Sequence, residues 1–176
     1  MIRQIMRTVL ILFVFVTAVP ISPAHGQNSA ETRATLANLP GVAIHVTRLA
    51  VEIESLGITS GVFRVEVERR LKAAGLTILH PDVQEPAPGD PTLHLDVTAV
   101  VDDPPDQISY AIRLELTQTV RLDRDPSFQV FHVVTWSVGG VAVYAKGWRR
   151  AIIEDVLGYT DEFVAAYSAA NPRLMD

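Results

Sequence analysis

Apolar and polar side chains alternate along four stretches of the chain, and such alternation predicts strands with one buried face. The first stretch covers residues 42–49, directly after Pro40 and Gly41. The other three lie beyond residue 91, and the apolar residues on one face of each are Leu93, Leu95, Val97, Ala99 and Val101; Tyr110, Ile112, Leu114, Leu116, Val120 and Leu122; and Phe128, Val130, Val134 and Trp136. Their connections are rich in Asp and Pro, which is typical of turns, so we expect an antiparallel meander.

Two other segments repeat apolar residues every three or four positions, which predicts amphipathic helices. The first begins at Thr59 or Ser60, either of which can cap it, and ends at Gly75. The second covers residues 149–170. Between them, the short apolar run 76–79 predicts a strand. Strand, helix and strand in this order form a βαβ unit, whose two strands are normally parallel.

These elements predict an α+β fold, specifically a two-layer sandwich. Its sheet would be mixed but mostly antiparallel, with about five strands and two helices on one face, in the order β-α-β-β-β-β-α. The other face would meet water, because its residues are polar: His94, Asp96, Arg113, Glu115, Thr117, Thr119 and Arg121.

The first residues of the chain have the pattern of an export signal. Arg3 and Arg7 precede an apolar run at residues 9–19, and small residues at Ala24 or Gly26 offer cleavage sites. The run is shorter than the roughly 20 residues of a membrane-spanning helix. We therefore expect a signal peptide at residues 1–26 and a mature protein in the periplasm or secreted, with no stable membrane span after cleavage. Residues 27–39 would be a mobile leader, 40–172 a single domain and 173–176 a tail.

The charge and the cysteine content of the chain argue against several classes of function. The chain has 15 Lys and Arg against 20 Asp and Glu, and it has no cysteine. Without a cluster of basic residues, binding to nucleic acid is not expected. Without cysteine there is no disulfide, no thiol catalysis, no lipid-modified cysteine and no Cys-based zinc site. Stability must come from apolar burial, which a content of 48% hydrophobic residues can support.

One pair of side chains has the spacing of metal or ligand chemistry. His94 and Asp96 are two apart on a predicted strand and so share a face, and His45 would be close if its strand is a neighbour. A zinc site needs three or four converging ligands, and a third is not assured. The alternative is cross-strand pairing of these residues with Arg113 and Glu115.

Four other motifs each have a functional and a structural interpretation. Ser137-Val138-Gly139 lacks the glycine that a nucleophile elbow has two positions before the serine. His132 lies in an apolar register and is expected in the core. The acidic run 102–106 fits a turn better than a calcium loop. Trp148, with two following arginines, could pack on the core or anchor a partner. No catalytic constellation emerges, so we predict a non-enzymatic protein without a cofactor.

Three stretches of the chain, at residues 67–75, 116–137 and 161–172, resemble a group of small secreted bacterial proteins of unknown function. The resemblance covers essentially the whole mature chain and implies an exported bacterial domain, with no catalytic residues to transfer. At the level of topology only, the strand-helix-strand start and the antiparallel continuation are similar to the amino-terminal domain of TolB.

The leading hypothesis is an interaction module of the bacterial cell envelope that binds an envelope protein through an exposed sheet face or edge. The candidate partner-binding residues are Asp96, Arg113, Glu115, Arg121 and Trp148. The alternative is a periplasmic protein that binds a small ligand or a metal around His45, His94 and Asp96.

Overall fold

A computed structural model describes residues 26–49, 51–55, 57–80, 87–101, 107–144 and 148–172. The predicted signal peptide, but for Gly26, the predicted tail at 173–176 and the acidic run 102–106 lie outside these residues. The elements in chain order are α1 (Ala30–Ala34), β1 (Ala43–Val46), α2 (Val51–Ser55), α3 (Ser60–Ala73), β2 (Thr92–Val101), β3 (Ile108–Leu122), β4 (Asp125–Tyr144) and α4 (Trp148–Ala170).

The four strands form one mixed sheet in the order β1-β2-β3-β4. β1 runs parallel to β2, while β2, β3 and β4 form the antiparallel meander that the sequence predicts. The chain passes from β1 through α3 to the parallel strand β2, which makes a βαβ unit. The α+β class and the mixed, mostly antiparallel sheet are thus confirmed.

The predicted strand at residues 76–79 is reduced to one parallel bridge between Val42 and Ile78. The expectation of about five strands is therefore wrong by this one element, and the parallel partner of β1 is β2. Pro81 follows two residues after Leu79 and has no N–H with which to continue a ladder. The short helix α2 was not predicted, because five residues are too few to show a helical period.

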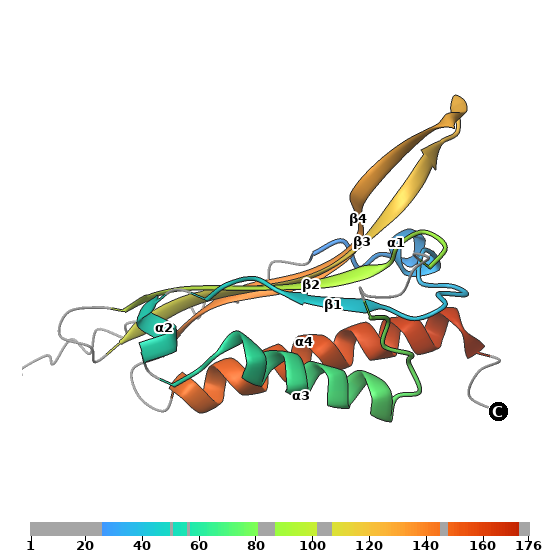
Figure 1. The fold of residues 1–176 in the computed structure, drawn as a ribbon. Helices are drawn as coiled ribbons and strands as arrows, with labels where there is room; N and C mark the ends of the chain where they lie inside the picture. The colour runs from blue at the N-terminus through green and yellow to red at the C-terminus, as the bar shows by residue number, and fades with distance from the viewer. Residues whose placement is uncertain are drawn as a thin grey trace, which may run out of the picture.

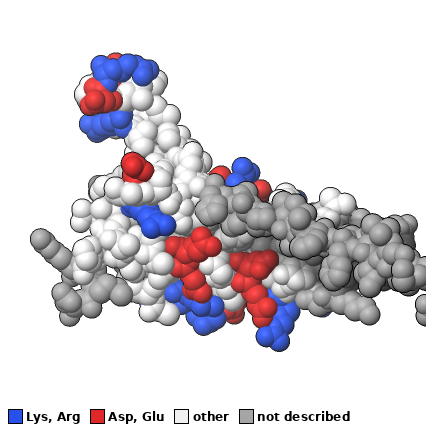
Figure 2. All heavy atoms as spheres, turned by 180° about the vertical axis from the view of Figure 1, so that it is seen from behind, with Lys and Arg blue, Asp and Glu red and all other residues white. Residues whose placement is uncertain are grey.

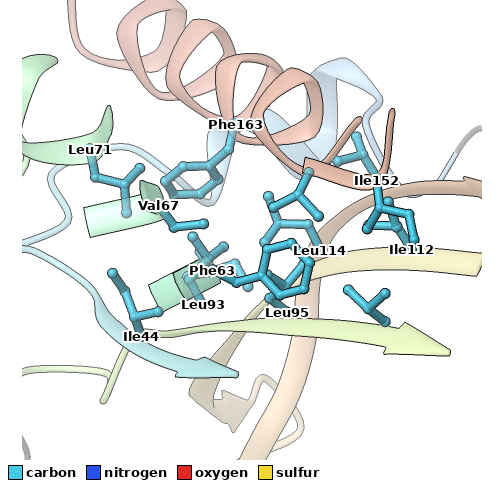
Figure 3. Packing of buried hydrophobic residues seen from close by; sticks show 14 of the residues in the cluster. Ile44, Phe63, Val67, Leu71, Leu93, Leu95, Ile112, Leu114, Ile152 and Phe163 are labelled. Carbon is cyan, nitrogen blue, oxygen red and sulfur yellow. The ribbon is translucent and has the colours of Figure 1, made fainter. Parts of the chain in front are cut away.

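Helices α3 and α4 lie side by side on one face of the sheet (Figure 1). Thr59 caps α3 by accepting a hydrogen bond from the Val62 N–H, and Gly75 takes the left-handed conformation after its end (φ +82°). Both features agree with the sequence prediction. The apolar stripes of the two helices meet the buried sheet residues in one core, as Figure 3 shows for Phe63, Phe163 and Leu114.

Residues 27–39, predicted to be a mobile leader, contact the domain in this structure. Leu36 is fully buried in the core, and the Trp136 indole N–H donates to Asn28 Oδ1 at 3.0 Å. The Asn171 amide, beyond the end of α4, donates to the Leu36 carbonyl at 2.9 Å. The segment thus joins the outer edge of β4 to the end of α4.

The end of the β3–β4 hairpin stands away from the sheet and the helices as a two-stranded arm (Figure 1). We define the arm as residues 120–132. Register shifts between Gln118 and Val120, together with a positive φ of +53° at His132, mark a bulge at its foot. Bulges bend and twist a ribbon, so this one accounts for the change of direction. His132 is exposed there, and its predicted place in the core is wrong.

Candidate functional site

The sheet face opposite α3 and α4, which we call the open face, carries four of the residues predicted to meet water: His94, Asp96, Arg113 and Glu115. The prediction is wrong for Thr117, which is buried at 6% exposure, and Arg121 lies on the arm. Because side chains alternate along a strand, every second residue of β2, β3 and β4 points to it. The register aligns three rows across the strands: His94 with Glu115; Asp96 with Arg113 and Gly139; and Val100 with Ser109 and Val143.

Three of the predicted partner-binding residues meet on this face. Arg113 lies between two carboxylates, with its Nη2 3.6 Å from Asp96 Oδ2 and its Nε 3.4 Å from Glu115 Oε1. The Arg113 side chain is largely exposed, whereas Asp96 and Glu115 are partly covered. Exposed ion pairs of this length contribute little to stability. The charges therefore remain available to another molecule at small cost to the fold.

Two histidines adjoin this cluster. His45 and His94 are register partners on β1 and β2, and their ring centroids are 5.2 Å apart. His94 Nε2 lies 3.0 Å from the Thr117 hydroxyl. Partial burial, and then the nearby His45 and His132, lower the pKa of His94. The neutral ring is therefore favoured in the folded protein.

The third member of the predicted metal set, Asp96, is engaged by Arg113. Within the residues that the structure describes, no group of three His, Cys, Asp or Glu side chains is placed to hold a metal ion.

An apolar patch lies beside the charged cluster and was not singled out from the sequence. It consists of Val100, Val141 and Val143, which are 67%, 74% and 56% exposed. The β3–β4 register is unbroken from Ile108 to Leu116, so β4 continues through Gly139 and Gly140 to Val141 and Val143 without a bulge. What the sequence did not show is that these valines face away from the helices, because that depends on the pairing register.

A shallow hollow of about 370 Å³ connects the patch to the cluster. Asp96 and Arg113 line its polar end, and Ala111 and Val141 line its apolar part. Gly139 forms the floor, and a side chain there would collide with the Ile112 carbonyl. Glycine at position 139 therefore allows the close approach of the β3 backbone and leaves this part of the hollow without a side chain.

The start of the described chain borders the hollow. Gln27 extends the outer edge of β4: its N–H donates to Ser137 Oγ at 3.0 Å, and its carbonyl accepts from the Ser137 N–H at 3.2 Å. Gly26 lies so close to Ser137 that a Cβ would collide with the Ser137 carbonyl. Ser137 therefore anchors this segment.

The other two predicted partner-binding residues lie elsewhere. Arg121 is on the arm, and Trp148 opens α4 and packs against the core. The Arg149 guanidinium is 5.9 Å from the centre of the Trp148 ring, and Arg150 pairs with Glu154 at 2.6 Å. The open face thus joins Asp96, Arg113 and Glu115, but neither Arg121 nor Trp148.

No protein-family model, no curated protein and no solved structure matches this chain. Of the helices that the structure describes, none has both the length and the apolar character to span a membrane.

Proposed function

We propose that this protein is an exported, non-enzymatic interaction module of the bacterial cell envelope, and that it binds a protein partner through the open face. The observation that carries the proposal is the contiguity of the Asp96–Arg113–Glu115 cluster with three exposed valines on one sheet face. Such a surface offers apolar area for affinity and fixed charges for orientation.

The chemistry of the open face predicts which side chains the partner's contact segment carries. Apolar side chains would cover Val141 and Val143, and a carboxylate beside them would reach the exposed Arg113. The pairing of Gln27 with Ser137 supports an extended segment, because it places main chain along the outer edge of β4. A partner strand added along β4 toward Tyr144 would then continue the same edge.

The hollow favours one alternative, a small-ligand-binding protein. A volume of about 370 Å³ falls in the range of small-molecule sites, and Asp96 and Arg113 could orient a polar ligand at its end. Filling the hollow by Ala111→Leu would remove ligand binding. The exposed valines outside the hollow make the protein partner the better supported function.

Co-purification of tagged variants after export tests the proposal. Val141→Glu places a charge in the apolar patch, and Arg113→Glu puts three carboxylates together. Both should abolish the recovery of a protein that wild type retains. Val65→Glu is the matched control, because Val65 is 64% exposed on α3. Equal recovery with all three folded variants would refute the open face as the binding surface.

A further inference from the structure

The arm carries the largest unexplained apolar exposure outside the open face. Phe128 and Phe131 are 56% and 64% exposed, and none of residues 120–132 is buried. Phenylalanine is a costly residue to leave in water, because its full burial is worth about 1.5–3 kcal/mol. Two such residues on one projecting ribbon indicate that the arm is covered in the assembled protein.

The arm is also poorly stabilised by its own chain. Its backbone hydrogen bonds run between β3 and β4, and within the described residues its side-chain hydrogen bonds join only Asp125 and Ser127. The last links to the body are at its foot, where the Thr119 N–H donates to the Gly89 carbonyl at 2.7 Å. An isolated two-stranded ribbon is marginal in water, and three or more strands with an apolar face are needed for independent stability.

The charges at the tip are self-complementary. Arg121 and Arg124 alternate with Asp123 and Asp125, so the tip carries two positive and two negative charges. Both signs are visible together at the end of the arm (Figure 2). Ion pairs join all four basic residues of α3, but none is found for these four tip residues among the described residues. An identical tip offers each of these charges an opposite partner.

We infer that the arm is a dimerisation element, and that its occupant is the arm of a second copy of this chain. Phe128 and Phe131 have opposite parity along β4, so they lie on opposite faces of the ribbon. Two arms that stack face to face about a two-fold axis bury one phenylalanine of each copy between them and pair arginines with aspartates across the axis. This inference rests on the arm alone and does not depend on the proposed function, because no residue of the open face takes part.

Light scattering on the exported full-length product tests the inference. Wild type should show twice the mass of one chain. The double variant Phe128→Ser/Phe131→Ser should show the mass of one chain. The matched control is Val62→Ser/Val65→Ser, which removes two exposed valines from α3 and should stay dimeric. A monomeric wild type, or a dimer that survives loss of both phenylalanines, would overturn the inference.

A charge-exchange experiment keeps the test independent of folding defects. Arg121→Glu/Arg124→Glu makes an acidic tip, and Asp123→Lys makes a basic one while leaving the Asp125–Ser127 bonds intact. Each variant alone should be mostly monomeric, and mixing the two should form a heterodimer. A dimer lost in Val141→Glu but kept in the arm variants would instead identify the open face as the contact between copies.

Discussion

His45 and His94 occupy the same register position on the parallel strands β1 and β2, with their ring centroids 5.2 Å apart. Protonation of both rings would bring two positive charges together, which is one reason why the pKa of His94 is lowered from 6.5. The unfolded chain therefore binds more protons than the folded one at mildly acidic pH. Stability from this site is complete above about pH 6.5 and decreases as the pH falls below it.

The predicted outcome is a lower melting temperature at pH 5.5 than at pH 7.5. His94→Gln should flatten this part of the pH dependence, and His45→Gln should flatten it less, because burial of His94 is the larger cause of its shift. Thermal melts of the three proteins across this range provide the measurement. A steeper pH dependence in His94→Gln than in wild type would contradict the assignment.

The contact between Trp136 and Asn28 predicts that the segment before β1 contributes to stability. Asn28→Ala leaves the indole N–H of the fully buried Trp136 without its acceptor, which should cost about 1–3 kcal/mol of unfolding free energy. Denaturant unfolding followed by tryptophan fluorescence measures the loss. Gln129→Ala, on the exposed arm, is the control and should change stability by less than about 0.5 kcal/mol. Equal stability of the two variants would argue that the segment is not held.

Asn171 provides a second test of the same packing from the other end of the chain. Its amide donates to the carbonyls of Leu36 and Tyr167, and its Oδ1 accepts from the Asn38 N–H at 2.8 Å. Asn171→Asp keeps the acceptor but loses both donors, so it should destabilise the protein by about 1–3 kcal/mol despite its similar shape. Chemical denaturation measures the loss. A denaturation midpoint of Asn171→Asp equal to that of wild type would contradict this prediction.

The close approach of Gly140 to Tyr159 predicts that a side chain at position 140 destabilises the protein. It lies beneath α4, and a Cβ at this position would overlap the Tyr159 hydroxyl. Gly140→Ala should therefore cost about 1–3 kcal/mol, as overpacking does. Removing the hydroxyl by Tyr159→Phe should restore much of the loss in the double variant. Additive effects in this double-mutant cycle would show that the two residues do not touch.

The fold could be predicted largely from local patterns. The period of α3 with its cap at Thr59, and the alternation along β2 and β3, are properties of neighbouring residues, and the structure reproduces them. Residues 76–79 have the apolar composition of a strand but make only one bridge, and Pro81, which has no N–H, prevents the ladder from continuing. Leu36 is fully buried but gave no signal of burial, since the residue that binds its carbonyl, Asn171, lies 135 positions away in the sequence.

The site was predicted less completely. Asp96, Arg113 and Glu115 could be placed on one face, because alternation fixes parity within a strand. Arg113 and Arg121 are an even number of residues apart on β3, so alternation alone would place both on the open face. The bulge at His132 changes the direction of the ribbon between them, and Arg121 therefore lies on the arm. A bulge depends on the pairing of two strands, so neither strand alone reveals it.

Site-specific photocrosslinking in intact cells, with the probe placed in turn at Val141 and at Val65, tests whether a partner binds the open face. Both positions are exposed, one on the open face and the other on α3. The account predicts one protein adduct of defined mass from position 141 that is absent from position 65 and disappears when Arg113→Glu is added. The same adducts from both positions, or an adduct unaffected by Arg113→Glu, would contradict binding through the open face.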